Sequence, residues 1–324
     1  MIPTRRTLLA AAGTSALTWA CGLRAAAPYP DKPVRMIVAF PPGGGTDIVA
    51  RLVAPRMSHY WNEQIIVDNR AGAGGVIGTE AAVRSPADGY TMLMATLGNL
   101  SINPHLYPMK VDPIKDLTPI TKVVDVNFVL VANPKLGVNS VQDLITMARA
   151  KPSQLTYSSS GVGGAPHLAG ELFCDLARVK MMHVPYKGSG PSFTDLLGGQ
   201  VQCTFDSLVQ ALPYVEDHRL RALAVLGPKR SRLLPDVPTM QEAGVDGYAF
   251  TNWFGLVAPT GTPPDAIRSM HDVVARTLAE PAVQQQLEQM GADPALTEPA
   301  QFGRIILADS QKWARILKEK GIKP

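Results

Sequence analysis

The sequence predicts an α/β protein of two domains, each a mainly parallel β-sheet flanked by helices. The chain has 324 residues, which corresponds to roughly two domains of about 150 residues each. Hydrophobic residues make up 46% of the chain and charged residues 18%, so a large apolar core is expected. From residue 33 onward, short β-rich runs alternate with amphipathic stretches, which is the order typical of a sheet covered by helices on both faces.

The first block of alternating elements lies between residues 33 and 95. A buried strand is predicted over 34–40, and the prolines and glycines of 41–45 end it. Apolar residues then recur at helical spacing as far as Met57, with Thr46 or Asp47 placed to cap the helix. The pattern continues with a strand at 64–68, a glycine turn at 72–75, a helix to about 84, a turn at 86–89 and a strand at 91–95.

A second block of the same kind lies between residues 140 and 226. Ser140 is placed to cap a helix that runs to about Ala150. The other expected elements are strands at 155–158, 181–186, 201–206 and 220–226, a small-residue loop at 159–164 and a helix at 167–178. Outside the blocks we expect extended connecting segments at 120–132 and 250–258, and a tail of two long helices over 264–320 that is interrupted near 291–294.

Two connections between the blocks predict a discontinuous first domain. It comprises residues 28–124 and 250–324, and residues 125–249 form the second domain. Two crossings between two α/β domains make a hinge, and ligands favour the crevice at such an interface. In open α/β sheets the loops after the carboxyl ends of the strands line that crevice, so the ligand cleft is expected between the domains.

Residues 1–27 have the features of an export signal. Arg5 and Arg6 precede an apolar stretch, and three alanines end at residue 27, before Pro28. The paired arginines suit a twin-arginine address, and an ordinary general-secretion signal is the alternative. Cys21 raises the alternative of a lipoprotein. Trp19 disfavours it, because a lipoprotein signal has a small residue at that position before the cysteine. The sequence therefore predicts a periplasmic protein and leaves the export route open.

Charge and cysteine content narrow the class of partner. The formal net charge of the chain is +4, and removal of residues 1–27 takes away three arginines and no acids, which leaves +1. No basic run remains that would follow a phosphate backbone, so no nucleic-acid partner is expected. No apolar run reaches the roughly 18–20 residues that span a bilayer. Cys174 and Cys203 fit two buried thiols, with a disulfide as the alternative.

The loop at 40–47 joins a predicted strand to a predicted helix start. Its three glycines let the backbone approach a ligand closely, and a helix N-terminus offers unpaired N–H groups. A carboxylate or a phosphate is therefore the expected ligand. A plain tight turn is the alternative. No Gly-Lys-Ser/Thr ending follows, which disfavours a nucleotide P-loop. The segment 69–78 repeats this construction, but its glycine spacing does not match a dinucleotide fingerprint.

Polar residues follow several other predicted strands. Thr96 and Asn99 come after the strand at 91–95 and are expected to face the same cleft. The serines and glycines of 158–164 lead into a helix with His167 in its first turn, where that histidine contacts a ligand or packs locally. Lys187 follows a predicted strand, so its ammonium group either lies near the cleft or points into solvent. Asp206 ends another strand and bonds either loop amides or a ligand amine.

Recognised catalytic and metal-binding patterns are missing from the sequence. It contains no Gly-x-Ser-x-Gly elbow, no His-Glu-x-x-His, no Cys-x-x-Cys and no histidines at metal-ligand spacing. We therefore expect no catalytic residues, no metal and no cofactor. Acid–base residues need not be adjacent in sequence, so an enzyme stays as an alternative.

Several segments together resemble the substrate-binding proteins of tripartite tricarboxylate transporters, also called the Bordetella uptake gene family. They are PVR at 33–35, FPPGGGTD at 40–47, NRAGAGG at 69–75, PADGY at 86–90, HVPYKG at 183–188, DLLGGQV at 195–201, RALAV at 221–225, LPDVPT at 234–239, WFGL at 253–256 and AP at 258–259. The resemblance covers essentially all of the chain after residue 27, in order.

The resemblance implies a type II periplasmic-binding-protein fold, the two-lobed Venus flytrap, that closes on a small carboxylated solute. It also implies integral-membrane permease subunits as partners, and a monomer is expected. In such proteins loop amides, hydroxyls and ordered waters hold the carboxylate. The ligand-binding residues that it implies are Phe40, Pro42, Gly43, Gly44, Thr46, Asp47, Ala73, Gly74, Thr96 and Asn99 on one lobe, and Ser159, Ser160, Gly161, Gly164, His167 and Asp206 on the other.

Two other functions stay open beside transport. One is a sensor protein that presents its ligand to a signalling receptor. The other is an exported enzyme acting on a carboxylated compound, with Asp206, His167 and Lys187 as its acid–base groups. The identity of the solute is also open, because residues 97 and 98 lie where members of this family vary.

Overall fold

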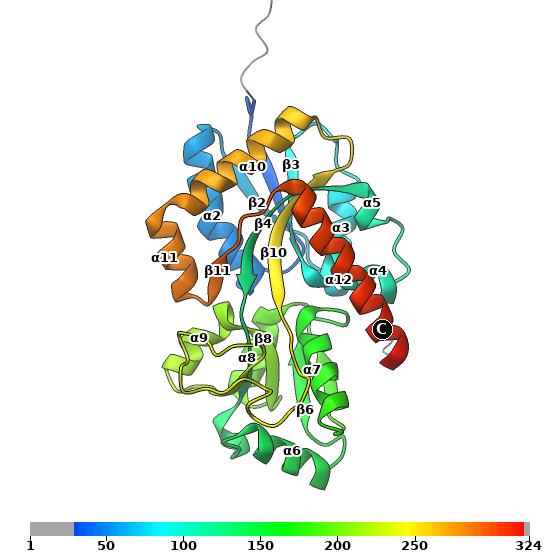
Figure 1. Ribbon diagram of the computed structural model, residues 1–324, viewed down its shortest axis with the longest axis vertical. Helices are drawn as coiled ribbons and strands as arrows, with labels where there is room; N and C mark the ends of the chain where they lie inside the picture. The colour runs from blue at the N-terminus through cyan, green and yellow to red at the C-terminus, as the bar shows by residue number, and fades with distance from the viewer. Residues whose placement is uncertain (1–28, 321–324) are drawn as a thin grey trace, which may run out of the picture.

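The computed structural model describes residues 29–320, and the chain folds into two lobes (Figure 1). The upper lobe contains a six-stranded sheet in the order β11-β4-β10-β3-β1-β2, and the lower lobe a five-stranded sheet in the order β7-β6-β8-β5-β9. The predicted two-lobed α/β fold is confirmed. The predicted export signal at 1–27, with Cys21, lies outside the described residues.

The strands of the upper sheet are β1 (Val34–Val38), β2 (Ile65–Asn69), β3 (Thr91–Thr96), β4 (Leu117–Val126), β10 (Asn252–Pro259) and β11 (Ala292–Pro294). Those of the lower sheet are β5 (Phe128–Ala132), β6 (Thr156–Ser159), β7 (Met182–Pro185), β8 (Cys203–Ser207) and β9 (Arg221–Val225). Strands β1, β3, β5, β8 and β10 are almost wholly buried, as expected for strands covered on both faces.

The helices of the upper lobe are α2 (Gly45–Trp61), α3 (Val76–Val83), α4 (Asn103–Leu106), α5 (Pro113–Asp116), α10 (Pro264–Ala279), α11 (Pro281–Gln289) and α12 (Pro299–Lys320), with short turns η1 (Ala73–Gly75) and η2 (Gly98–Ile102). Those of the lower lobe are α6 (Val141–Ala150), α7 (Ala165–Leu176), α8 (Ser189–Gly198) and α9 (Leu208–Glu216), with the turn η3 (Pro134–Leu136). Ser140 caps α6 as predicted, accepting a hydrogen bond from the Asp143 amide at 3.1 Å.

Both sheets are mixed, whereas the sequence predicted mainly parallel ones. In the upper sheet β1 runs parallel to β2 and β3, but β10 and β4 are antiparallel to their neighbours. In the lower sheet β6 is parallel to β7 and β8, and β5 is antiparallel to β8 and β9. The antiparallel strands are those next to the lobe crossings, where the chain enters a sheet from the other lobe instead of through a βαβ unit.

The chain crosses between the lobes twice. Strand β4 ends at Val126 in the upper sheet and β5 begins at Phe128 in the lower one, so Asn127 alone separates them. The return follows β9 through residues 226–251, which stay with the lower lobe until β10 begins at Asn252 (Figure 1). The domain boundaries at 124/125 and 249/250 stay a prediction, and these two crossings support them.

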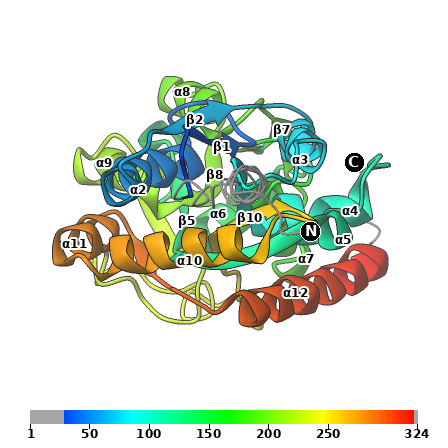
Figure 2. The same cartoon turned by 90° about the horizontal axis from the view of Figure 1, so that it is seen from above.

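The C-terminal tail contains three helices, and the two-helix prediction was wrong there. Helix α10 ends at Ala279 and α11 begins at Pro281, because Glu280 has an extended backbone and a proline cannot continue the preceding helix. The interruption near 291–294 is confirmed as β11. Seen from above, α10 and α12 flank one side of the upper lobe, so the tail completes the lobe that the N-terminal residues begin (Figure 2).

Two further sequence expectations can be compared with the described residues. Cys174 and Cys203 are free thiols; Cys203 is buried in β8 and Cys174 is partly buried in α7. In the part of the chain that is described, no helix combines the length and the apolar character needed to cross a bilayer.

Helix α12 lies close to β10 at Gly255. A Cβ added there would be 2.3 Å from Cζ of Phe302, whose buried ring packs edge-on against Trp253 with centroids 5.0 Å apart. The same Cβ would lie 2.9 Å from the Thr121 carbonyl oxygen of the neighbouring strand. Only glycine allows the helix and the sheet this approach.

The substitution Gly255→Ala should therefore lower the free energy of unfolding by about 1–3 kcal/mol, the usual cost of overpacking a core. Gly303→Ala on α12 is the matched control, since its Cβ would make an ordinary 3.4 Å contact with Pro119. Urea unfolding of both variants measures the difference. If both variants were equally stable, helix α12 would be able to move away from Gly255 without a loss of stability.

Candidate functional site

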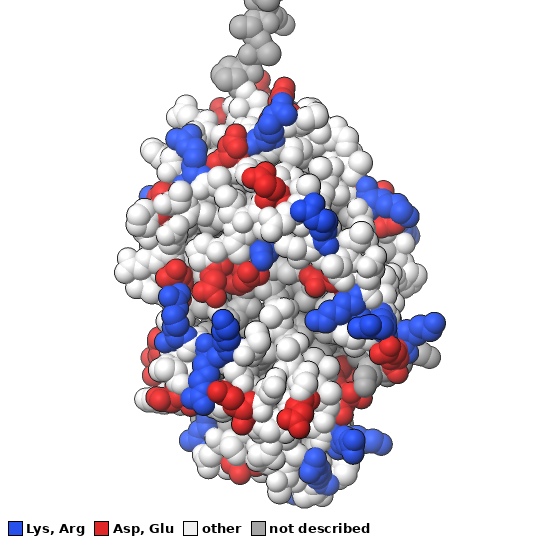
Figure 3. Space-filling model, in the orientation of Figure 1, with Lys and Arg blue, Asp and Glu red and all other residues white. Residues whose placement is uncertain are grey.

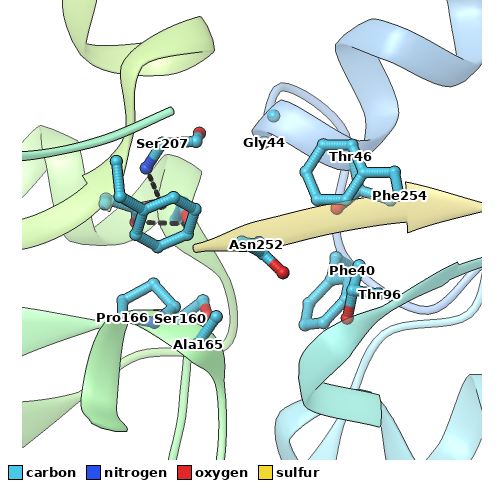
Figure 4. Close-up of a pocket in the computed structure, with 14 residues that line it drawn as sticks. Phe40, Gly44, Thr46, Thr96, Ser160, Ala165, Pro166, Ser207, Asn252 and Phe254 are labelled. Carbon is cyan, nitrogen blue, oxygen red and sulfur yellow. Dashed lines mark hydrogen bonds between the residues drawn. The ribbon is translucent and has the colours of Figure 1, made fainter. Parts of the chain in front are cut away.

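A cavity of about 40 Å³ lies between the two lobes and is called the aspartate cavity here (Figure 4). Its lining is Phe40, Gly44, Gly45, Thr46, Thr96, Phe128, Ser160, Ala165, Pro166, Ser189, Asp206, Ser207, Asn252 and Phe254. In the close-up, labelled residues of the upper lobe face those of the lower lobe, with Asn252 of β10 between them. The site is thus formed only when the lobes are together.

Four helices begin at the aspartate cavity. Their first residues or N-caps in the lining are Gly44 and Gly45 of α2, Ala165 of α7, Ser189 of α8 and Ser207 of α9. The first turn of a helix has N–H groups without intrahelical acceptors and carries a partial positive charge. The cavity is therefore suited to hydrogen-bond acceptors and to negative charge.

Asp206 is the one ionisable side chain in this lining. Its Oδ2 accepts a hydrogen bond from Ser189 Oγ at 2.6 Å, and its Oδ1 accepts one from the Ser207 amide at 2.7 Å. Burial raises the pKa of the Asp206 carboxyl to about 6, and the two hydrogen bonds oppose that rise. The lining contains no lysine, arginine or histidine, so this carboxyl has backbone and hydroxyl dipoles around it and no counter-ion.

Two other polar atoms of the lining are buried without a partner. They are Oγ of Ser207 and Oδ1 of Asn252. A buried polar atom without a partner costs free energy, because it has lost its hydrogen bonds to water. Both atoms are therefore free to bond to a molecule that enters the cavity.

A second cavity of about 260 Å³ adjoins the first and is called the lysine cavity here. Its lining is Phe40, Gly72, Ala73, Gly74, Gly75, Tyr107, Ser160, Gly161, Val162, Pro185, Tyr186 and Lys187. Phe40 and Ser160 belong to both linings and thus separate the two spaces. Lys187 brings a cation here, and the glycine turns of both lobes bring main-chain groups.

Asp47 supports the first glycine loop and does not line either cavity. Its Oδ2 accepts from the Gly43 amide at 2.9 Å, its Oδ1 accepts from Asn69 at 2.9 Å, and Arg51 pairs with both oxygens. These bonds lower the pKa of the Asp47 carboxyl against the opposing effect of burial. The helix starts at Gly45 without a side-chain cap, so Asp47 holds the loop from inside the first turn instead.

Asn99 plays the same supporting part for Thr96. Its Oδ1 accepts hydrogen bonds from the amide of Thr96 at 2.6 Å and from its Oγ1 at 3.0 Å. Asn99 is fully buried and lines neither cavity, whereas Thr96 lines the aspartate cavity. The asparagine was predicted to bind ligand, which stays a prediction; in this geometry its Oδ1 fixes a residue of the cavity lining.

A histidine pair supports the 159–164 loop of the lower lobe. The rings of His167 and His183 stack with centroids 4.1 Å apart. His183 Nε2 bonds to Ser159 Oγ at 2.6 Å, and His167 Nδ1 accepts from the Gly163 amide at 3.2 Å. Burial lowers the pKa of His167 to about 4 and that of His183 to about 3, the latter with a contribution from the neighbouring ring. The loop therefore rests on two neutral imidazoles.

The two lobes approach each other closely at three glycines. A Cβ on Gly45 would lie 2.5 Å from Ser207 Oγ, one on Gly74 would lie 2.3 Å from the Val162 oxygen, and one on Gly188 would lie 2.4 Å from Pro41 Cδ. Tyr107 Oη of the upper lobe also donates to the Val162 oxygen at 2.8 Å. These contacts describe a closed arrangement of the lobes.

The sequence-predicted site residues fall into three groups. Those in the aspartate cavity are Phe40, Gly44, Thr46, Thr96, Ser160 and Asp206. Those that line the lysine cavity are Ala73, Gly74 and Gly161, with Phe40 and Ser160 shared. Those that line neither are Pro42, Gly43, Asp47, Asn99, Ser159, Gly164 and His167, which shape or brace the loops.

The sequence reasoning missed eight lining residues. They are Gly45, Phe128, Ala165, Pro166, Ser189, Ser207, Asn252 and Phe254. Gly45 lies inside the predicted 40–47 loop, and Ala165, Pro166, Ser189 and Ser207 follow a predicted loop or strand within three residues, so including every residue at each helix start would have found all five. Phe128, Asn252 and Phe254 lie on the crossing strands, where the local sequence carries no ligand signal.

Acid should destabilise the fold through the histidine pair. Both histidines have folded-state pKa values below the ordinary 6.5, so their stabilisation is complete above that pH and is lost as the pH falls toward 4 and below. For His167 the loss approaches about 3 kcal/mol, at about 1.4 kcal/mol per pKa unit. His167→Gln keeps an acceptor for Gly163 and does not titrate. Urea unfolding between pH 7.5 and 4 should show a shallower loss in the variant, and superimposable losses would refute this assignment.

Among the described residues, no group of three or more His, Cys, Asp or Glu side chains is arranged to hold a metal ion. The prediction of no cofactor stays a prediction.

Comparisons with known proteins agree with this geometry. Residues 49–322 match the family described as tripartite tricarboxylate transporter family receptor. The protein BugT of Bordetella pertussis is 39% identical over 300 residues, which cover 91% of this chain and 91% of BugT.

Solved structures of similar fold come from the same kind of protein. Rpa4515 of Rhodopseudomonas palustris, determined with adipate, is 38% identical with a TM-score of 0.89 over 91% of this chain and 99% of that one. MatC of the same organism, determined with bound malate, is 27% identical with a TM-score of 0.85 over 89% and 100%. Other close structures are described as a periplasmic transporter and a periplasmic binding protein. The chain therefore belongs to the tripartite tricarboxylate transporter receptor family, and it has the fold and the two-lobed cleft of a periplasmic solute-binding receptor.

Proposed function

We propose that this protein captures a small carboxylated solute in the periplasm by closure of its two lobes and delivers it to the membrane subunits of a tripartite tricarboxylate-type transporter. The observation that carries the proposal is the polar character of the cleft as a whole: four helix N-termini reach the aspartate cavity, and Lys187 and the amides of glycine turns line the adjoining lysine cavity. The adipate and malate in two similar structures support a carboxylated solute.

Closure supplies the mechanism of capture. Each cavity takes its lining from both lobes, so a solute makes its full set of contacts only in the closed form. A ligand shifts the equilibrium between open and closed forms by its difference in affinity for the two. The closed form differs in surface shape from the open one, and we propose that the membrane subunits recognise it.

Periplasmic location rests on the export signal expected at 1–27 and on the family. Lys, Arg, Asp and Glu side chains are intermixed on the face that Figure 3 shows. This distribution suits a receptor that attracts its solute by the polar groups of its cleft.

The alternative of an exported enzyme gains no support from the geometry. Its three candidate groups are separated: Asp206 lines the aspartate cavity, Lys187 lines the lysine cavity, and His167 lines neither. His167 Nδ1 is also occupied by the Gly163 amide. No pair of these groups is positioned to act on one atom of a bound solute.

A thermal-shift screen tests the carboxylate proposal. Dicarboxylates of four to six carbons and their diamides are added to the purified protein at equal concentrations. A ligand at 100 times its dissociation constant stabilises the folded state by about 2.7 kcal/mol, so a bound acid should raise the melting temperature clearly. Equal shifts by acids and diamides would count against carboxylate recognition. Solutes recovered from the complex should be chemically unchanged, and a product would favour the enzyme.

Closure itself is tested at Gly45. The substitution Gly45→Ala places a methyl group against Ser207 of the other lobe, while the helical backbone at this position accepts alanine. We expect solute affinity to fall by about 5- to 150-fold, because about 1–3 kcal/mol of overpacking applies to the closed form alone. Thermal stability without solute should hardly change.

Gly198→Ala is the control for this prediction. Gly198 ends α8, and a Cβ there would have its nearest neighbour 4.0 Å away at Gln200 Cγ. Isothermal titration with the acid found in the screen measures both variants. If Gly45→Ala binds as tightly as the control, the closed arrangement is not the one that holds the solute.

A further inference from the structure

We propose that Asp206 makes the aspartate cavity select a solute group that carries a hydrogen, such as a hydroxyl, an amide, an ammonium or a protonated carboxyl, in preference to a bare carboxylate. The inference deepens the proposed function and rests on it. It assigns different chemistry to the two ends of the solute: a hydrogen-bond donor at Asp206 and a carboxylate at the lysine cavity.

The first step is the hydrogen-bond capacity of Asp206. Each of its oxygens already accepts one bond, from Ser189 Oγ and from the Ser207 amide. A carboxylate oxygen can accept two, so capacity remains on the side of the cavity. A solute group that meets the carboxylate there must donate.

The second step is the lack of a counter-ion. None of the residues lining the aspartate cavity is basic. The acidic and histidine side chains of α7, α8 and α9, which pack on β8, lie outside the lining: His167, Glu171, Asp175, Asp195 and Glu216. Asp47 and His59 of α2 lie outside it as well. Two bare carboxylates in one buried space repel each other, and such pairs hold one proton between them. The raised pKa of Asp206 indicates that this carboxyl already bears a cost of burial.

The third step is a second acceptor in the same cavity. Oδ1 of Asn252 is buried without a hydrogen bond, and Figure 4 shows the end of this side chain pointing into the space between the lobes. Asp206 and Asn252 thus present acceptors from opposite elements, β8 and β10. A hydroxyl or a protonated carboxyl has one hydrogen and can donate to one of these acceptors, whereas an amide or an ammonium has a hydrogen for each.

The fourth step is size. The aspartate cavity, at about 40 Å³, is much smaller than the lysine cavity, at about 260 Å³, so it suits one end of a solute. The rest of a longer solute must pass Phe40 and Ser160 into the lysine cavity. There Lys187 and the loop amides are placed for the carboxylate at the other end.

The test is isothermal titration at pH 8 with succinate, glutarate and adipate and with the monoamide of each. Titrations in two buffers of different ionisation enthalpy count the protons taken up. We expect each monoamide that binds to be at least tenfold tighter than its diacid and to take up no proton. The diacid should take up about one proton per site, because at pH 8 both it and Asp206 start ionised.

The substitution Asp206→Asn should reverse the preference and abolish the proton uptake. Asp143→Asn is the matched control: this lower-lobe carboxylate accepts from the Asn139 amide and lies outside both cavities, and the variant should keep the wild-type ratio. The wild-type proton count tests the inference even if Asp206→Asn fails to fold.

Two results would overturn the inference while leaving the proposed function intact. One is a diacid that binds the wild type as tightly as its monoamide without proton uptake. The other is an unchanged ratio in folded Asp206→Asn. If no diacid or monoamide binds any of the proteins, carboxylate capture itself fails, and the inference fails with it.

Discussion

The contact on which the whole site depends is the close approach of glycine main chain in one lobe to atoms of the other lobe. Gly45, Gly74 and Gly188 meet Ser207, Val162 and Pro41 of the opposite lobe at distances where a Cβ would not fit. This tight approach brings helix starts of both lobes around one small cavity. A larger residue at any of these positions would hold the lobes apart and remove half of the lining from the solute.

This arrangement explains why the aspartate cavity needs no basic side chain. Helix N-termini supply fixed partial charges that do not have to be ordered when a ligand arrives, whereas a lysine or arginine would lose side-chain freedom on binding. Fixed dipoles also tolerate Asp206 in their midst. The buried carboxyl and the dipoles together make a site that is attractive to polar solutes and selective about which end enters.

Buried polar residues behind the cleft fix the loops that line the two cavities. Asp47 and Asn99 are polar, buried and near the cleft, which is the usual description of a ligand-binding residue. Their hydrogen bonds nevertheless go to the Gly43 amide and to Thr96. The stacked histidines do the same for the 159–164 loop. A buried polar residue in such a cleft can therefore either face the solute or hold a loop in place. Only its hydrogen-bond partners show which of the two it does.

The sequence by itself determined the two-lobed α/β architecture, the family and the glycine loops at the cleft. These depend on short-range patterns: apolar periodicity, turn residues and helix starts directly after strands. For that reason it pointed to Phe40, Thr46 and Asp206, which line the aspartate cavity. It misjudged the tail at Pro281, where the two helices were read as one, and it made the sheets mainly parallel because local patterns do not show strand direction.

Only the tertiary structure decided which loops share a cavity and which polar groups face it. Phe128, Asn252 and Phe254 enter the lining because β5 and β10 flank the lobe crossings, a property of the path of the chain that no local window contains. The same holds for Asp47, whose carboxylate is turned away from the cavities by Arg51 and by Asn69 from a neighbouring strand. Long-range contacts set the direction of a side chain, and that direction separates a residue that binds solute from one that braces the site.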